Sequence, residues 1–425
     1  MNSNIKSSIA TKVIVAGINF LLVILSVRYL GASGRGEISF FITLLATIQL
    51  FSEILNGPTI IYLSTRLSVK NQLIVSFLWS LIISVLSYFV SELLELKDSL
   101  LLAVCSFQFS LASICLMILQ GNHRIKLYNF LSILQSIILL TLFVFLVLTV
   151  NKSYHSFIYA FFFSWNIPFI ISFLVILITL IKKNKKSENF KEAFKQMFLK
   201  GVESQSGNIA SFLNYRLIFY IIAFIDTNKT MLGIVSTGFA ITESILIISS
   251  GLSTIQYPAI AKKATVDEAK IITTNYLIIC FWFSITGIVV LNLIPAEFYN
   301  YIFGKDFSSI KTIILIISPG ILFLNMQNTI CQYFNGLGLY IINTIGSIIG
   351  LTSLVILSYI GIGYSFGMNG LCVSVSLSYM TLYLYMLYSF IKHSKISFLE
   401  MIFYFKDSKN ILLKTLFNKS EPINE

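Results

Sequence analysis

Residues 127–150 read LYNFLSILQSIILLTLFVFLVLTV, and no residue of this stretch is charged. Arg124 and Lys126 precede it and Lys152 follows it, so the charges stand at its two ends. A run of about 20 apolar residues is the length at which an α-helix crosses a hydrocarbon core about 30 Å thick. The strands of a porin-type barrel would instead need alternating patterns about ten residues long. The stretch therefore predicts a transmembrane helix.

The rest of the chain repeats this pattern. Of its 425 residues, 56% are hydrophobic and 11% are charged, whereas soluble proteins carry about 25% charged residues. The composition excludes a soluble protein and predicts an all-α polytopic membrane protein with about twelve transmembrane helices. The predicted spans are 9–30, 38–64, 72–91, 99–120, 127–150, 155–181, 202–225, 231–259, 271–294, 311–335, 340–362 and 367–391.

The basic residues predict the orientation of these spans. With the N-terminus inside, 22 of the 30 Lys and Arg residues fall on the cytoplasmic side and 7 on the other. Cytoplasmic connectors carry such an excess, so we expect both termini in the cytoplasm. The net charge of +12 then reflects topology and attraction to an anionic inner leaflet. We do not expect a nucleic-acid partner, because the basic residues are dispersed rather than gathered on one face.

Two halves of the chain resemble each other. Leu119-Gln120-Gly121-Asn122 closes the fourth span, and Phe334-Asn335-Gly336-Leu337 closes the tenth. The repeat predicts two six-helix lobes, 1–181 and 201–391, arranged as a parallel pseudo-repeat around a central cavity. A basic cytoplasmic connector, 182–200, joins the lobes, and a basic cytoplasmic tail, 392–425, follows them.

One basic residue, Arg216, lies inside a predicted span, and Asn214 stands two residues before it. An ionisable group at the centre of a transmembrane helix costs roughly 2.5–3.5 kcal/mol on insertion scales, so it indicates a path or a partner. A guanidinium binds phosphate through two parallel hydrogen bonds, so a lipid phosphate is a suitable ligand. The alternative is a structural ion pair with a carboxylate.

Other polar residues inside spans are weaker candidates. Glu53 lies on a polar stripe of the second span and Glu243 on one of the eighth. Either could be the partner of Arg216, carry a coupling proton or sodium ion, or hold helices together. Asn325 and Gln332 belong to a polar ladder of the tenth span, which suits either sugar hydroxyls or interhelix hydrogen bonds.

Several kinds of chemistry find no support in the sequence. There is no Gly-x-x-x-x-Gly-Lys-Ser/Thr loop for nucleotide phosphates and no Asp-rich cluster for a metal. The five cysteines lie inside apolar runs without a CxxC pair, so they are interpreted as packing residues. We expect no catalytic residues, no metal and no cofactor. Transport, rather than catalysis, remains as the function class.

The chain resembles a known family in an ordered set of motifs from about residue 5 to residue 391. The motifs are Tyr29-Leu30-Gly31 with Gly34 and Gly36, Leu119-Gln120-Gly121 with Tyr128-Asn129, Asn214-Tyr215-Arg216, Phe303-Gly304-Lys305-Asp306-Phe307, Asn335-Gly336-Leu337-Gly338, and 360–378 with Gly361, Gly367 and Gly370. Together they resemble polysaccharide repeat-unit (O-antigen, Wzx-type) flippases of the multidrug/oligosaccharidyl-lipid/polysaccharide exporter superfamily.

That resemblance implies a flippase in a bacterial inner membrane that works by alternating access. It implies a substrate, an undecaprenyl-pyrophosphate-linked oligosaccharide moved from the cytoplasmic to the periplasmic leaflet for O-antigen or capsule assembly. It implies membrane lipids, a polysaccharide polymerase and a chain-length regulator as partners. The alternatives are a MATE-like cation-coupled exporter of small molecules and a membrane-embedded sugar transferase or polymerase.

The sequence departs from the family at one place near Arg216. The family often has an aspartate two residues after this arginine, and here the position is Ile218. We therefore expect Arg216 to lack a built-in counter-ion, which would leave it freer for an anionic ligand.

Overall fold

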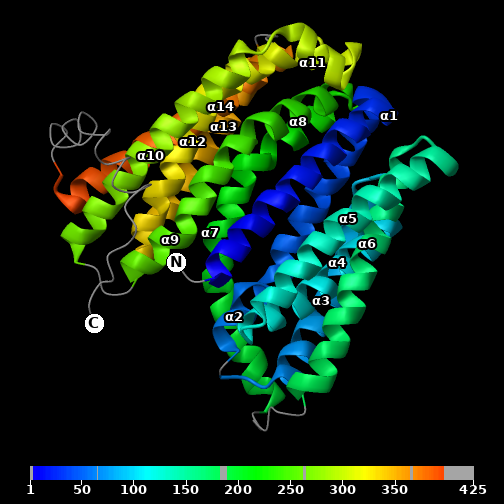
Figure 1. The fold of residues 1–425 in the computed structure, drawn as a ribbon, viewed down its shortest axis with the longest axis vertical. Coiled ribbons are helices and arrows are strands. Elements are labelled where there is room, and N and C mark those ends of the chain that lie inside the picture. The colour runs from blue at the N-terminus through cyan, green and yellow to red at the C-terminus, as the bar shows by residue number, and fades with distance from the viewer. Residues whose placement is uncertain (1–2, 65, 182–188, 262–264, 364–366, 397–425) are drawn as a thin grey trace. The chain divides into compact units, whose positions relative to one another are not determined.

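The computed structural model describes residues 3–64, 66–181, 189–261, 265–363 and 367–396 (Figure 1). Within these residues the secondary structure is helical throughout, with no strand, which confirms the all-α prediction. The helices are α1 (Ser3–Asn56), α2 (Pro58–Leu63), α3 (Val69–Leu93), α4 (Ser99–Gly121), α5 (Ile125–Thr149), α6 (Tyr154–Val175), α7 (Phe190–Ile225), α8 (Thr230–Glu243), α9 (Ile247–Ala261), α10 (Val266–Leu293), α11 (Ala296–Phe303), α12 (Ile310–Gly336), α13 (Tyr340–Gly363) and α14 (Gly367–Ser394), with short η1 (Ile176–Ile181), η2 (Ser244–Leu246) and η3 (Lys305–Phe307).

The described residues contain ten helices long and apolar enough to cross a membrane, so the chain is a multi-pass membrane protein. One of the ten, Ala10–Leu63, covers the first two predicted spans. The eighth predicted span, 231–259, is divided into α8 and α9 by the 3₁₀ turn η2. With these two cases counted, the helices agree with about twelve spans.

Two connectors between predicted spans contain helical residues. In the connector 31–37 the helix breaks at Gly31, where φ is 67°, and helical geometry resumes after it. A left-handed φ is accessible to glycine at little cost, so one residue is enough to redirect the chain. Residues 190–200 were expected to belong to a connector, yet they form the first turns of α7. Residues 182–188 of that connector, and 397–425 of the predicted tail, lie outside the described residues.

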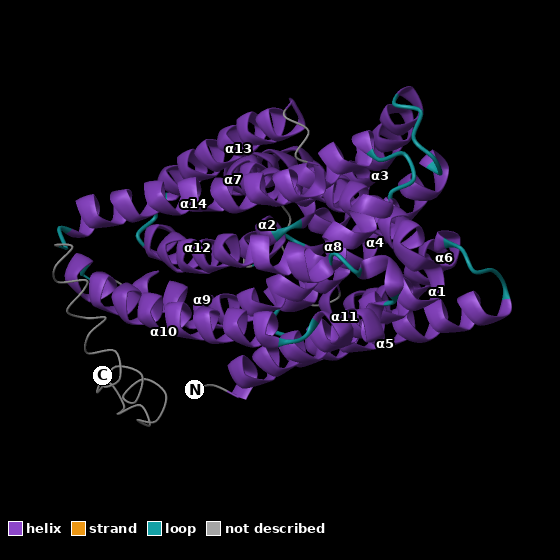
Figure 2. Ribbon diagram, turned by 90° about the horizontal axis from the view of Figure 1, so that it is seen from above, coloured by secondary structure: helices purple, strands orange, loops and turns teal. Residues whose placement is uncertain are grey.

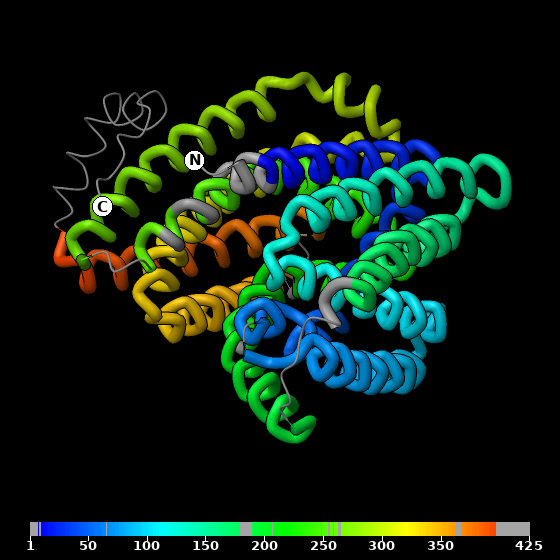
Figure 3. The backbone as a smooth tube through the Cα atoms, turned by 60° about the horizontal axis from the view of Figure 1, so that its bottom comes forward, coloured from blue at the N-terminus to red at the C-terminus, as the bar shows by residue number. Residues whose placement is uncertain are grey.

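The chain divides into two compact units, which do not coincide with the predicted lobes at their boundaries. The first comprises 1–209, 219–237 and 300–308, and the second 210–218, 238–299 and 309–425. In the first unit, α4 packs against α1, α2, α3, α5 and α6 (Figures 1 and 3). In the second, α12 packs against α9, α10, α13 and α14 (Figure 2). Each unit is thus a helical bundle built around one central helix.

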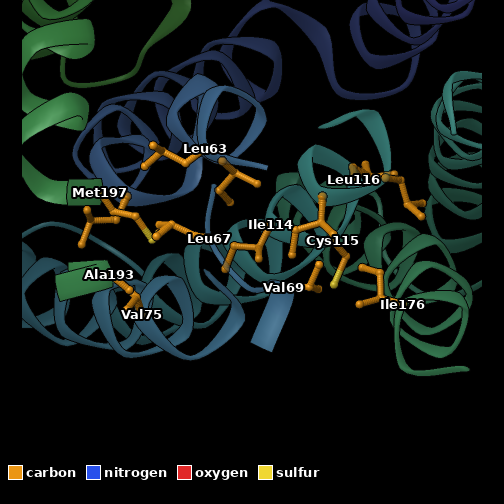
Figure 4. Packing of buried hydrophobic residues seen from close by; sticks show 14 of the residues in the cluster. Leu63, Leu67, Val69, Val75, Ile114, Cys115, Leu116, Ile176, Ala193 and Met197 are labelled. Carbon is orange, nitrogen blue, oxygen red and sulfur yellow. The ribbon is translucent and has the colours of Figure 1, made fainter. Parts of the chain in front are cut away.

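The core of the first unit explains why α7 begins early. Ala193 and Met197 are fully buried in a cluster with Leu63, Leu67 and Val75 (Figure 4). These two side chains are four residues apart and so lie on one face of the helix. The charged residues of this part of the predicted connector are exposed on its other faces. Burial of that apolar face is what stabilises the helix there.

The two central helices end in the same way. After α4, Arg124 N–H donates to the carbonyl of Leu119 at 2.9 Å and His123 N–H to that of Gln120 at 3.1 Å. After α12, the corresponding bonds run from Leu339 to Phe334 at 2.8 Å and from Gly338 to Asn335 at 3.1 Å. Both pairs form the Schellman motif, with His123 and Gly338 at left-handed φ values of 61° and 76°.

The glycine that closes each central helix also packs in an equivalent place. A Cβ on Gly121 would lie 3.0 Å from Cβ of Ser64, just after α2, and a Cβ on Gly336 would lie 2.6 Å from Cγ2 of Ile260, in α9. These neighbours end the second and the eighth predicted spans. The sequence repeat therefore corresponds to a repeat in local structure, described for each unit by itself.

Candidate functional site

Arg216 forms an ion pair inside the second unit. Its Nη2 atom lies 3.2 Å from Oε2 of Glu243, and the two side chains are 31% and 25% exposed. The expectation that Arg216 lacks a counter-ion was wrong, because the next helix supplies the carboxylate that the missing aspartate would have provided. Of the two carboxylates considered, the partner is Glu243. Ile218 is fully buried.

Glu243 lies where the helix is interrupted. It is the last residue of α8 and immediately precedes the 3₁₀ turn Ser244–Leu246, after which α9 begins. A 3₁₀ stretch within a helix often marks a hinge or a functional site, because the regular backbone hydrogen bonding changes there. Breaks of this kind in transmembrane helices also form ion and substrate sites in transporters. Among the described residues of this unit, the predicted spans are interrupted only at this 3₁₀ turn, and the ion pair stands beside it.

Helix α14 contacts α7 directly before Arg216. The hydroxyl of Ser378 donates to the side-chain oxygen of Asn214 at 3.0 Å. The ring of Tyr379 packs edge-on against that of Tyr215, with 5.9 Å between centroids. These two contacts fix the register between the helices within two residues of Arg216.

Tyr379 is a polar residue of this cluster that the sequence did not single out. Its side chain is fully buried, and its hydroxyl has no hydrogen-bond partner among the described residues. Its ring lies beside that of Tyr215, the residue before Arg216, so it belongs to the part of the second unit that contains the ion pair. The hydroxyl of Tyr215 donates to the side-chain oxygen of Asn328 at 3.5 Å, the limit for a hydrogen bond.

The other predicted substrate contacts lie in different surroundings. Asn214 is 1% exposed and is held against α14. Asn325 is fully buried and donates to Ser284 of α10, while Gln332 is partly exposed on α12. Interhelix bonding accounts for Asn214 and Asn325 as placed, and their contact with substrate stays a prediction.

Glu53 belongs to the first unit, and its polar stripe faces neighbouring helices. Gln49 accepts a hydrogen bond from Ser110 of α4 at 3.0 Å, and Asn56 donates to Ser80 of α3 at 2.5 Å. Glu53 itself is partly exposed, and Gln205 donates to its backbone carbonyl at 3.4 Å. Its role in ion coupling stays a prediction.

A pocket of about 310 Å³ lies in the first unit near the start of α4, and it contains none of the predicted site residues. Its wall includes Asp98, which accepts a hydrogen bond from Tyr154 at 2.6 Å and lies 3.2 Å from Nε2 of His155. Lys97 and Glu37 approach within 3.9 Å. No group of three or more metal-ligating side chains occurs among the described residues.

Known structures share this fold over nearly the whole chain. The lipid II flippase MurJ, in an inward closed conformation, matches with a TM-score of 0.73 and 17% identity over 97% of this chain and 93% of MurJ. A multidrug resistance MATE transporter of the MOP superfamily, in an inward-facing conformation, matches with a TM-score of 0.64 and 15% identity over 96% of each chain.

The MATE transporter VcmN of Vibrio cholerae, in its bent form, matches with a TM-score of 0.63 and 11% identity over 95% of this chain and 99% of VcmN. No protein-family model and no curated protein matches the sequence. The chain therefore has the fold that MurJ and the MATE transporters share.

Proposed function

We propose that this protein is a flippase that moves an undecaprenyl-pyrophosphate-linked oligosaccharide from the cytoplasmic to the periplasmic leaflet of a bacterial inner membrane by alternating access. The observation that carries the proposal is the pair of Arg216 and Glu243 at the break between α8 and α9. A partly exposed guanidinium at membrane depth suits a diphosphate, which it binds through charge-assisted hydrogen bonds. The fold shared with a lipid II flippase agrees with a lipid-linked substrate.

The energetics of the substrate define what the protein must supply. Each sugar hydroxyl moved into hydrocarbon without a partner costs several kcal/mol, so the head group needs a polar, hydrated path while the polyprenyl tail stays in lipid. With the cytoplasm negative, outward movement of an anion is favoured by about 2.3 kcal/mol per charge per 100 mV. Membrane potential can therefore contribute to the drive, and an Arg216 that stays in place does not cancel it.

A MATE-like cation exporter is the second candidate, because MATE transporters share the fold. A cation site would be expected to hold acidic groups without a bound guanidinium. Glu243, however, is paired with Arg216, which favours an anionic substrate.

The test uses the purified full chain in liposomes that contain an undecaprenyl-pyrophosphate-linked disaccharide in both leaflets. A membrane-impermeant glycosyltransferase then modifies whatever sugar reaches the outer leaflet. A flippase brings the inner-leaflet pool into reach, so all of the substrate is modified. The proposal would fail if only the outer-leaflet half of the substrate were modified. If the same liposomes also showed sodium- or proton-driven efflux of ethidium, the protein would be a MATE-like exporter instead.

A further inference from the structure

We infer that Tyr379 is a second ligand of the anionic group that Arg216 binds, and that this anion displaces Glu243 from the guanidinium. The inference rests on the proposed function and names two residues of that site that act in binding. It begins from the buried hydroxyl of Tyr379, for which the described part of the chain provides no hydrogen-bond partner.

A buried hydroxyl without a partner is unfavourable, because it has lost water and gained nothing. Nearly all buried polar groups of proteins are hydrogen-bonded, so an exception calls for a reason such as a ligand that completes the site. Tyr379 lies beside the turn of α7 that bears Arg216, since its ring packs against that of Tyr215, the residue before Arg216. A phenol donates its proton to an anion, which makes it a suitable second donor beside a guanidinium.

The contacts around Tyr379 hold its ring in place. The adjacent residue, Ser378, bonds to Asn214 at 3.0 Å, and the Tyr379 ring lies against Tyr215 at 5.9 Å. Because both contacts join α14 to the turn of α7 that bears Arg216, the ring of Tyr379 is held beside that turn. A donor that is already positioned loses little conformational entropy when a ligand arrives.

In this structure the carboxylate of Glu243 binds the guanidinium of Arg216. Its bond to Arg216 joins one nitrogen and one oxygen at 3.2 Å, which is longer than the 2.7–2.9 Å typical of strong charge-assisted bonds. A diphosphate offers more oxygens and more charge than one carboxylate, so it competes effectively for the guanidinium. Glu243 is 25% exposed, so the displaced carboxylate can be hydrated.

The experiment measures binding of inorganic pyrophosphate to the full chain in nanodiscs, by calorimetry, together with the melting temperature of each variant. Tyr379→Phe keeps the ring and removes the hydroxyl. Its expected effect is a loss of affinity of about tenfold, as for a hydrogen bond to a charged group, with a melting temperature equal to or above that of the wild type. Tyr383→Phe is the matched control, because Tyr383 is one turn further along α14 and stacks on Phe323.

Glu243→Gln removes the competing charge at nearly constant shape, so affinity should rise several-fold. The inference would be overturned if Tyr379→Phe bound pyrophosphate as tightly as the wild type, or if it lost affinity together with a lower melting temperature. It would also be overturned if Tyr383→Phe lost as much affinity as Tyr379→Phe, or if Glu243→Gln bound pyrophosphate more weakly than the wild type. Arg216→Ala separates this result from the proposed function. If that variant binds like the wild type, the anion site at Arg216 is wrong. If it does not bind while Tyr379→Phe binds normally, only the inference fails.

Discussion

Reversal of the two charges in the Arg216–Glu243 pair separates a structural role from a role in substrate binding. At 3.2 Å and an effective dielectric constant of about 20, the Coulomb attraction is about 5 kcal/mol. Both side chains are partly exposed, at 31% and 25%, and exposed pairs contribute only about 0.2–1 kcal/mol. An intermediate value of about 2 kcal/mol is therefore reasonable for this pair.

Arg216→Glu and Glu243→Arg each place like charges opposite one another and should destabilise the protein by about 2 kcal/mol or more. The double variant restores opposite charges, so its stability should return to within about 1 kcal/mol of the wild type. Its flipping activity should be lost, because the cation then stands at the end of α8 and the proposed anion site on α7 carries a carboxylate.

The assay is a thermal melt in detergent followed by the liposome flipping assay at a temperature where all variants are folded. A double variant that flips at the wild-type rate would refute the reasoning, because any pair of opposite charges would then suffice. Single variants as stable as the wild type would show that the pair contributes nothing to folding.

Two further predictions concern packing and the role of an amide. Gly36→Ala should destabilise the first unit by about 1–3 kcal/mol through overpacking, since the new Cβ would lie 1.8 Å from the carbonyl oxygen of Lys229. Gly251→Ala is the control, because a Cβ at Gly251 would meet no atom within 4 Å, so the melting temperature should stay unchanged or rise. An equal loss of stability in both variants would argue against the close approach of Gly36 to Lys229. Asn214→Ala should lower stability by about 1–3 kcal/mol, because Ser378 loses its acceptor, and an unchanged flipping rate of the folded protein would leave Asn214 a structural role alone. A lost rate at full stability would instead place Asn214 among the substrate contacts.

The positions of the spans could be predicted because a chain in a bilayer must place about 20 apolar residues between polar ends. The secondary structure of the connectors could not be predicted in the same way, since it depends on contacts with residues far along the chain. Arg28, for example, precedes the kink at Gly31 and donates to the backbone carbonyls of Tyr301 and Ile302 at 2.8 and 2.9 Å. Arg28 thus stands just before the break at Gly31, and its side chain bonds to residues about 270 positions further along the chain.

The site was partly predictable for a similar reason. An arginine inside a span is costly, so Arg216 was apparent from the sequence alone. Its partner was not decided, because Glu243 is 27 residues away and Glu53 was an equal candidate. Tyr379 was missed because a tyrosine in an apolar run gives no signal. Its position beside Arg216 depends on packing of α14 against α7, which brings together residues about 164 positions apart.

The flipping rate of Arg216 variants tests the central claim most directly. Arg216→Lys keeps a cation beside Glu243 but loses the bidentate geometry, and Arg216→Gln loses the charge as well. In liposomes with an undecaprenyl-pyrophosphate-linked disaccharide, the account predicts a reduced rate for Arg216→Lys and a rate roughly a hundredfold below wild type for Arg216→Gln, as for two lost hydrogen bonds to a charged group. Wild-type flipping by Arg216→Gln would contradict the claim that this arginine binds the diphosphate.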